Sequence, residues 1–512
     1  MKYFLFFCTV LICISCTSVS KYNEQLKTQI SVEKLHQDVD YSYTQLQKFH
    51  PDLYGYITKD SLDSVFKMVK NDIQKPLTPA ELFQKLAPAI SQVRQGHLAL
   101  RSPFQRFTKK ETKRLELQKG LLARMGYVVD GDRLFVKNNA EKFANIKVGT
   151  EILKIGDVPA KTILNDYRKY ITGDGWNRTY PKYSLARRWP DLYTLEHGFL
   201  DSVKLETKYQ NVIHSFYIKR EFQTKEEKKE ETKKVSVLKT DPQKKTLDYN
   251  PKTKLYNRSM QYLGKDSTIA YMKINSFSGT FSSKFYKESF ARLQQNKTNY
   301  LILDVRDNLG GSLSEIHNLY SYLAKEEFQF IKDIEVTRRS SMTHANYFSE
   351  IPTIAKPIAG ITYPLYYMGS LLSVKKRNNH FYLKNNTIFT LKKPKKTAFQ
   401  GTVYVLINGS SFSASSILSS KLKYEKRATL VGEETGGAND GTVAGRYHTI
   451  KLPNSKLVLP IGLMLIQPDI EPTHSKKGVI PDHQIIPTLQ ENLGKKDVAL
   501  QWILKDIGVV RE

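Results

Sequence analysis

The stretch that decides the fold is LILDVRDNLGGSL at residues 301–313, a hydrophobic strand that runs directly into a loop with two adjacent glycines. A second stretch, VYVLINGSSFSASSIL at residues 403–418, has the same plan, with a strand, a serine-rich turn and the start of a helix. Buried strands alternating with helices are typical of α/β proteins, which bind ligands at the carboxyl ends of the strands. These two loops therefore mark the candidate functional edge of the molecule.

The residue types in the two loops suit catalysis or anion binding. Gly310 and Gly311 have no Cβ, so backbone N–H groups there can point into a crevice, as an oxyanion hole or a phosphate cradle requires. Neither G-x-G-x-x-G nor a P-loop occurs here, which disfavours a nucleotide site. A serine at a helix start is either a cap, which is the commoner case, or a nucleophile favoured by the helix end. The turn also lacks the G-x-S-x-G pattern of the α/β-hydrolases.

The surrounding sequence extends this α/β pattern over residues 257–490. A strand at TIAYMKI, residues 268–274, precedes an amphipathic helix and then the first of the two loops. Residues 342–400 separate the two loops and are expected to form an insertion or a lid. Residues 491–512 are expected to form a C-terminal helix.

The N-terminal region has a different pattern. Residues 30–112 show the periodicity of amphipathic helices, and this predicts a helical module. Within it, Thr78, Pro79 and Glu81 are typical of a helix cap, a first-turn proline and a capping-box partner.

Residues 118–220 contain short β-rich runs instead. Among them, KVGTEILKIGDVPA at residues 147–160 resembles a PDZ domain, whose exposed sheet edge can take a peptide terminus as an added strand. An unrelated small β domain is the alternative. Residues 221–256 are almost all charged or polar, which predicts a solvated linker or insertion.

Composition limits the class of protein. The chain has 512 residues, 40% hydrophobic and 25% charged, which indicates about two to four globular domains and excludes disorder, collagen and a polytopic membrane protein. The net charge of +29 favours proximity to anionic surfaces. Because the basic residues are spread without one dominant block, specific nucleic-acid binding is disfavoured. A solvated basic surface is the simpler explanation, and binding of an anionic polymer is kept as an alternative.

All three cysteines, Cys8, Cys13 and Cys16, lie in the first sixteen residues, so the rest of the chain has no disulfide, thiolate metal site or cysteine nucleophile. Lys2, an apolar run and a small residue are typical of a signal peptide over residues 1–16. The end of this segment resembles the bacterial lipobox, which implies that Cys16 is lipidated. Cys13 stands where that pattern usually has leucine, and an ordinary secreted protein cleaved nearby is the alternative.

Seven motifs occur in the order found in one enzyme family: VRQGHLAL, KVGTEILKIGDVPA, LILDVRDNLGGSL, INGSSFSASSIL, LVGEETGGA, LPNSKLVLP and GVIPD. In these motifs the chain resembles the C-terminal-processing (tail-specific) serine peptidases, and among them the branch that includes the tricorn protease core. The resemblance spans about residues 30 to 490. It implies a mixed α/β (α+β) fold, with an N-terminal helical module, a PDZ-like β domain and a ClpP/crotonase-like α/β peptidase core.

The resemblance places the nucleophile at Ser413, the first serine of the S-A-S turn, with Ser411 and Ser415 as competitors. In the processing branch a lysine base follows the T-x-G turn, but residues 435–438 read TGGA, so that lysine is missing. The tricorn-like solution uses a histidine from the N-terminal part of the chain, and His97 in QGHLAL matches it. An imidazole near its ordinary pKa can take the serine proton and return it to the leaving amine.

Two positions near the expected site depart from the pattern or are ambiguous. Gln95 stands where many relatives have aspartate. The carboxylate that would orient the histidine corresponds to Glu471, just before GVIPD, with Asp469 and His474 close to it in the sequence. The implied oxyanion donors are the backbone N–H groups of Gly310 or Gly311 and of Ala414.

We therefore expect a secreted or lipid-anchored serine peptidase that cleaves peptide bonds through an acyl-enzyme, with the PDZ-like domain selecting substrates. Peptide or protein substrates and, through the lipid anchor, a membrane are the expected partners, in the cell envelope of a bacterium as a periplasmic or outer-membrane lipoprotein. No metal or organic cofactor is expected, because no H-E-x-x-H occurs and the histidines are scattered. The missing lysine and Gln95 motivate one alternative, a catalytically inactive peptide-binding or scaffolding lipoprotein with the same fold.

Overall fold

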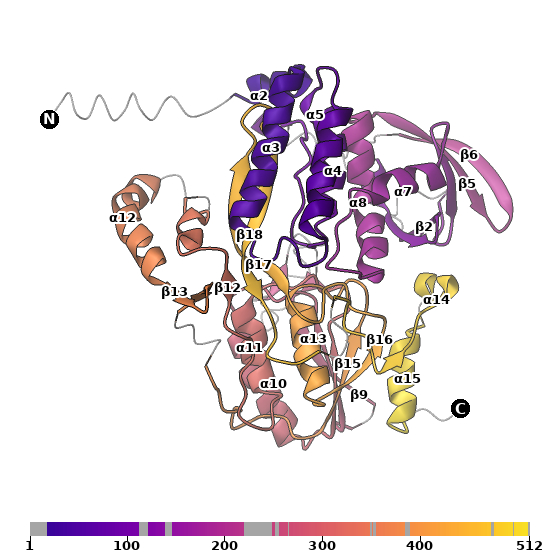
Figure 1. Ribbon diagram of the computed structural model, residues 1–512. Coiled ribbons are helices and arrows are strands. Elements are labelled where there is room, and N and C mark those ends of the chain that lie inside the picture. Colours follow the sequence, from indigo (N-terminus) through magenta and orange to yellow (C-terminus); the bar gives the residue numbers. More distant parts are fainter. Residues whose placement is uncertain are drawn as a thin grey trace.

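The computed structural model describes residues 18–111, 121–138, 146–219, 248–250, 255–264, 266–348, 351, 355–384, 390–472, 476–494 and 496–509. The predicted signal peptide with Cys16, and most of the predicted linker at 221–256, lie outside the described residues. Helices and strands are mixed along the chain, as Figure 1 shows, and this confirms the predicted α/β class. Within the described part, no helix combines the length and the apolar composition that crossing a membrane requires.

A six-stranded sheet forms the centre of the C-terminal half, in the order β19-β16-β15-β11-β10-β9. Neighbouring strands are parallel except for β9, which pairs antiparallel with β10. The loops at 301–313 and 403–418 follow the adjacent strands β11 and β15, so both lie at the carboxyl edge of the sheet. The strands are β9 (Arg258–Leu263), β10 (Ile269–Ile274), β11 (Tyr300–Asp304), β15 (Thr402–Ile407), β16 (Thr429–Gly432) and β19 (His483–Gln484).

Different helices bury the two faces of this sheet. Successive residues of a strand point to opposite faces, and accordingly Leu301 and Leu303 belong to one core whereas Ile302 belongs to another. The first core includes side chains of α10 (Ser282–Gln295), α11 (Leu313–Ser321) and α13 (Ala414–Tyr424). The second core includes Ala499 and Ile503 of α15 (Val498–Asp506), which follows the short helix α14 (Leu489–Leu493).

The N-terminal helices share one hydrophobic core with this sheet. Asp38, buried on α3, accepts the backbone N–H of Asn454 at 2.8 Å and that of Ser455 at 2.7 Å, in the turn between β17 and β18. The N-terminal region and the C-terminal half are therefore packed as one body. The helices are α2 (Val19–Lys27), α3 (Val32–Phe49), α4 (Lys59–Asp72) and α5 (Pro79–Ser91).

A second sheet, in the order β13-β14-β12-β18-β17, is antiparallel. Its strands are β12 (Glu335–Val336), β13 (Val374–Arg377), β14 (His380–Leu383), β17 (Thr442–Lys451) and β18 (Val458–Ile466). Residues 342–400 contribute part of the 3-10 turn η2 (Ser341–His344), the helix α12 (Lys356–Leu372) and the hairpin β13–β14. Whether this segment is an insertion or a lid stays a prediction.

The β-rich region forms its own unit around a separate core that contains the fully buried Trp189. Its sheet has the order β1-β2-β3-β5-β6, with β4 paired to β3. The predicted PDZ-like identity of this unit stays a prediction. The elements are η1 (Leu122–Arg124), β1 (Gly126–Asp130), β2 (Arg133–Asn138), β3 (Glu151–Ile155), β4 (Val158–Pro159), α7 (Ala160–Arg168), α8 (Thr179–His197), β5 (Ser202–Tyr209) and β6 (Val212–Lys219), followed by the small pair β7 (Tyr249–Asn250) and β8 (Leu255–Tyr256).

Candidate active site

Ser413 occupies the turn between β15 and α13 in a backbone conformation that serine rarely adopts. Its φ of 57° and ψ of −118° are strained, and such strain persists only where the surroundings hold the chain. The two competing serines provide part of that hold. Ser411 Oγ donates to Val305 O at 2.9 Å, and Ser415 Oγ donates to Asn308 O at 2.8 Å. Both are buried structural groups, whereas the Ser413 hydroxyl meets a histidine.

That histidine is His97, whose Nε2 lies 2.9 Å from Ser413 Oγ. His97 lies on the loop that follows α5. The carboxylate of Asp174 holds this loop, because the Gly96 N–H donates to Asp174 Oδ1 at 2.6 Å. The imidazole also packs against the ring of Phe412, with 4.9 Å between the ring centroids. The structure thus brings together the predicted nucleophile and the predicted base, which are 316 positions apart in the chain.

The second ring nitrogen of His97 faces a tyrosine. Tyr447 Oη lies 3.2 Å from His97 Nδ1. Tyr447 follows a β-bulge, because the register between β17 and β18 shifts between Ala444 and Tyr447, and Gly445 there has a φ of 79°. Bulges redirect the side chains that follow them. Sequence analysis missed Tyr447 because a tyrosine in a strand carries no motif, and Gly445, two residues earlier, is the one local signal.

The expected contact between Glu471 and His97 is not formed. The Glu471 side chain is 93% exposed and pairs with Lys332, with 2.8 Å between Oε1 and Nζ. This hydrogen-bonded ion pair lowers the pKa of Glu471 below its ordinary value. Three residues before Glu471, Pro468 forms a β-bridge with Ile331, the residue before Lys332. The orienting role that the resemblance implied for Glu471 is therefore corrected.

The predicted oxyanion donors lie on two loops that touch at Ser413. A Cβ on Gly310, whose φ is 102°, would lie 2.8 Å from Ser413 Cβ, so the close approach requires glycine. The Gly310 N–H donates to Asn308 Oδ1 at 2.9 Å and is therefore occupied. In the part of the chain that the structure describes, the N–H groups of Gly311 and Ala414 have no partner. These two groups remain available as donors, and the Ala414 N–H directly follows Ser413 in the chain.

Part of the chain matches a known protein family. The sequence of residues 268–485 matches Peptidase family S41. These residues are a peptidase S41 domain. Over these residues the predicted resemblance to a serine peptidase family is confirmed. Ser413 lies within the S41 domain, whereas His97 comes from the helical region before it.

One solved structure shows the same fold, and two others are more distantly similar. A structure described as mature CPAF complexed with lactacystin has a TM-score of 0.60 and 14% identity, covering 93% of this chain and 98% of that chain. The photosystem II D1 C-terminal processing protease has a TM-score of 0.42 and 12% identity, with 90% and 96% covered. The tricorn protease has a TM-score of 0.33 and 14% identity, with 93% and 36% covered. The comparison with curated proteins gives no match.

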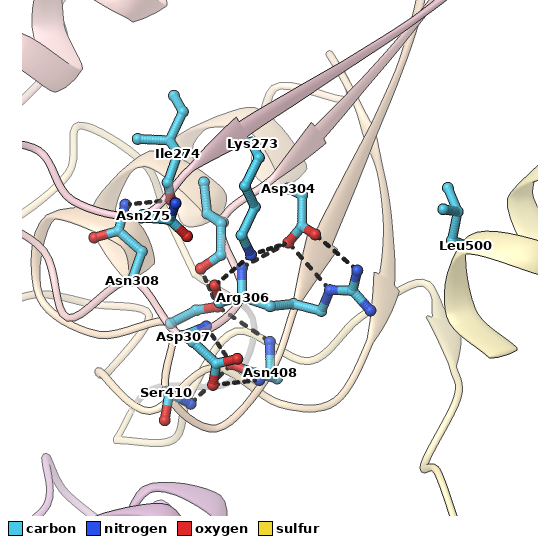
Figure 2. Close-up of polar contacts among 12 residues, drawn as sticks. Lys273, Ile274, Asn275, Asp304, Arg306, Asp307, Asn308, Asn408, Ser410 and Leu500 are labelled. Carbon is cyan, nitrogen blue, oxygen red and sulfur yellow. Dashed lines mark hydrogen bonds and ion pairs between the residues drawn. The ribbon is translucent and has the colours of Figure 1, made fainter. Parts of the chain in front are cut away.

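Polar contacts fasten the two loops of the S41 domain to each other (Figure 2). The Asp307 N–H donates to Asn408 Oδ1 at 3.0 Å, and Asn408 Nδ2 returns a hydrogen bond to Asp307 Oδ1 at 3.1 Å. Asn308 Nδ2 donates to Ile274 O at 3.0 Å, and the Ser410 N–H donates to Asn408 Oδ1 at 3.0 Å. The glycine loop and the nucleophile turn are therefore held as one rigid edge.

Beneath these loops, Asp304 ends strand β11 as a buried carboxylate with two cationic partners (Figure 2). Its oxygens accept from Lys273 Nζ at 3.0 Å and from Arg306 at 2.7 Å. Burial alone would raise the pKa of Asp304, but Lys273 and Arg306 lower it to about 2. At neutral pH Asp304 is therefore an ionised carboxylate at the carboxyl edge of the S41 sheet.

Glycine occupies the segment in which the processing branch carries its lysine base. A Cβ on Gly437 would lie 2.6 Å from Ser416 Oγ and 3.0 Å from the nitrogen of Ser413. The Gly437 N–H donates to Ser416 Oγ at 3.0 Å, and the Gly436 N–H donates to Ser411 O at 2.8 Å. The TGG turn therefore supports the nucleophile with its backbone and supplies no side-chain base.

Helix α8 of the β-rich unit also contacts the nucleophile turn. Tyr180 stacks on Phe412 with 4.5 Å between centroids, and Arg187 donates to Ser410 Oγ at 2.6 Å. Tyr183 donates to Glu433 Oε2 at 2.7 Å. Sequence analysis missed these residues, since a helix of mixed composition between two β regions carries no catalytic pattern. The β-rich unit is thus in direct contact with the S41 site.

The environment of the base is poor in water. Burial lowers the pKa of His97 to about 4, so the imidazole is neutral at physiological pH. Burial raises the pKa of Asp174 to about 7, and burial together with Asp440 raises that of Asp52 to about 6. Among the described residues, no set of three or more His, Cys, Asp and Glu side chains has the arrangement of a metal site.

Proposed function

We propose that the protein hydrolyses peptide bonds through an acyl-enzyme formed on Ser413, with His97 as the general base. One observation carries the proposal: a serine in a strained strand-to-helix turn has its Oγ 2.9 Å from a neutral imidazole nitrogen. A nucleophile within hydrogen-bond distance of a base is the arrangement that acyl transfer needs. The start of α13 at Ala414 adds the partial positive charge of a helix N-terminus.

In this mechanism Ser413 Oγ attacks the carbonyl carbon of the scissile bond while its proton passes to His97 Nε2. The oxyanion accepts hydrogen bonds from the N–H groups of Gly311 and Ala414. Collapse breaks the C–N bond, and the proton on Nε2 passes to the leaving amine. A water molecule then attacks the acyl-enzyme, gives its proton to Nε2 and releases the carboxylic acid with regeneration of Ser413.

The contact with Tyr447 is compatible with the tautomer that this step needs. When the Nδ1–H group of His97 donates to Tyr447 Oη, at 3.2 Å, Nε2 is the unprotonated nitrogen and accepts the serine proton. Tyr447 is thus a positioning residue in the place where many hydrolases have a carboxylate. Because the tyrosine is neutral, it provides no counter-charge for the imidazolium.

The test is covalent labelling with a fluorophosphonate probe, on the chain from residue 17 onward, with the labelled peptide identified by mass spectrometry. We expect labelling at Ser413, its loss in Ser413→Ala and a large decrease in His97→Ala. His380→Ala is the matched control, because His380 is a surface side chain on β14 that is 57% exposed. A wild-type protein that is folded but takes no label would favour the alternative, an inactive peptide-binding scaffold.

We further propose that the β-rich unit selects substrates. The contacts from Tyr180 and Arg187 of α8 to Phe412 and Ser410 support this, because they link the unit to the nucleophile turn. Peptides ending in different residues would be compared as substrates of the wild type and of Arg187→Ala. A change in the order of preference is expected, and an equal decrease for every peptide would contradict selection by this unit.

The location of the protein is proposed from its sequence. The lipobox-like segment ending at Cys16 supports a lipoprotein of the bacterial cell envelope, periplasmic or in the outer membrane. Metabolic labelling with a palmitate analogue should mark the wild type and leave Cys16→Ser unmarked. Labelling that persists in Cys16→Ser would exclude this anchor.

A further inference from the structure

Helix α12 exposes a continuous apolar stripe. Its members are spaced three and four positions apart, which places them on one face of the helix. Their exposed fractions are unusually high for large apolar side chains: Ile358 67%, Ile361 80%, Leu365 76%, Met368 55% and Leu372 63%. From the first to the last, the stripe is about 21 Å long at the rise of an α-helix. Exposed apolar surface of this extent marks an interaction site.

The opposite face of α12 fastens the helix to the body of the protein. Ala359 and Ser370 are buried there, and Tyr366 Oη donates to Met342 O at 3.1 Å. Tyr366 also stacks on Tyr347, with 4.2 Å between the ring centroids. The orientation of the helix is therefore fixed, and the stripe faces outward. Figure 1 shows α12 at the outer edge of the molecule, on the side away from α14 and α15.

The sequence around the stripe is basic throughout. Residues 351–400 contain nine lysine and arginine residues and no aspartate or glutamate. Lys356 begins α12 and is exposed, and the hairpin that follows the helix carries further basic side chains. The nine residues are Lys356, Lys375, Lys376, Arg377, Lys384, Lys392, Lys393, Lys395 and Lys396.

We propose that α12 lies in the surface of an anionic lipid bilayer, with its apolar stripe among the acyl chains and the flanking basic side chains at the phosphate groups. An apolar helix face combined with nearby positive charge is the combination that binds such surfaces. This inference does not depend on peptidase activity.

A second copy of the chain is the competing occupant, since the same spacing could form a helix–helix seam. Charge argues against it. Lys375 and Arg377 pair with Asp333, and Lys393 pairs with Glu327. Each segment still has an excess of positive charge, so pairing two α12 helices would bring like charges together. A lipid surface with anionic headgroups instead complements this charge.

The test uses the chain from residue 17 onward, which retains every described residue but has no lipid anchor. Co-sedimentation is measured with vesicles of phosphatidylethanolamine and phosphatidylglycerol, and with vesicles of phosphatidylcholine. We expect binding to the anionic vesicles that decreases with salt, and at least about tenfold weaker binding for Ile361→Glu/Leu365→Glu. Val212→Glu/Ile213→Glu is the matched control, because these side chains on β6 are 53% and 60% exposed.

A second measurement does not depend on a disruptive change. Leu365→Trp should show a blue-shifted fluorescence that brominated lipids quench, whereas Ile213→Trp should show neither effect. Equal binding of the stripe and control variants, or an unquenched tryptophan at position 365, would overturn the proposal. Sedimentation as a dimer that Ile361→Glu/Leu365→Glu abolishes, without vesicle binding by the wild type, would overturn it in favour of a second copy.

Discussion

At the level of the single residue, His97 would be an unusual base, because the group that faces its Nδ1 is the neutral hydroxyl of Tyr447. Burial keeps the imidazole unprotonated, with the pKa lowered to about 4 from an ordinary value of 6.5. A neutral base is ready to accept a proton, but it forms an imidazolium without an adjacent carboxylate. The site therefore depends on hydrogen-bond geometry more than on an ion pair.

This pKa predicts the pH dependence of the enzyme. In the free enzyme the acid limb of kcat/KM should lie near pH 4, because His97 stays neutral as the pH falls through 6.5. The same shift lowers stability in that window, since the unfolded chain takes up a proton that the folded histidine does not. Initial rates measured on a fluorogenic peptide between pH 3 and 9 would locate the acid limb of kcat/KM. An acid limb near 6.5 would contradict the prediction.

Tyr447→Phe removes the hydroxyl that faces His97 Nδ1. We expect kcat to decrease about tenfold to a hundredfold with little change in KM, because tautomer and ring orientation matter in the transition state. The fold should be retained, since the ring remains. Tyr382→Phe, on strand β14 away from the site, serves as the control. An unchanged kcat would show that Tyr447 does not position the base.

Among the elements of the site, the loop after β11 is the least tolerant of a larger side chain, and Gly310 shows why. Gly310 combines a φ of 102° with backbone and side-chain atoms of the nucleophile turn within 3 Å of a hypothetical Cβ. Strand β11 ends where that loop begins, and β15 ends where the turn begins, so the parallel register of the two strands sets the approach. Small displacements of either loop would move the oxyanion donors relative to Ser413.

Gly310→Ala should therefore abolish most activity. The new methyl group would displace the Ser413 turn, and kcat/KM is expected to decrease about a hundredfold or more. Gly264→Ala is the matched control, because Gly264 has a φ of 88° and nothing within 4 Å of its hypothetical Cβ. Both substitutions place alanine at a positive φ, but only the methyl group of Gly310→Ala would contact the nucleophile turn. Equal activities of the two variants would exclude a steric role.

The elements of the S41 domain could be predicted from the sequence because each strand is a short buried run that ends in small residues. The partners Ser413 and His97 followed from motifs whose order is specific. Tyr447 could not be predicted, since a bulge in β17 decides where its side chain points. Glu471 was assigned from its position before GVIPD, but its side chain is exposed and pairs with Lys332.

On the scale of the whole molecule, the base and the nucleophile belong to parts that must be held together. Asp38 is one such link, because its buried carboxylate accepts N–H groups from Asn454 and Ser455 in the β17–β18 turn. Tyr447 lies on β17, the first of these two strands. Coupling between α3 and this turn thus supports the geometry around His97 from a distance.

Asp38→Ala should lower the free energy of unfolding by about 1–3 kcal/mol, because it leaves two largely buried N–H groups without an acceptor. Asp40→Ala, two positions along the same helix, removes a carboxylate that is 59% exposed and pairs with Lys70, and should cost less than about 1 kcal/mol. Chemical denaturation of both variants provides the comparison. Similar values for the two would exclude Asp38 as a structural link.

The separation of 316 positions between His97 and Ser413 has a consequence for the cell that makes this peptidase. A growing chain emerges from the ribosome with its N-terminus first, so the histidine is exposed long before the serine exists. Tyr447 and strand β18 follow later still. Partly synthesised chains that lack Ser413 therefore cannot form the proposed pair of nucleophile and base, so the site can be completed only after residues 402–451 have been made.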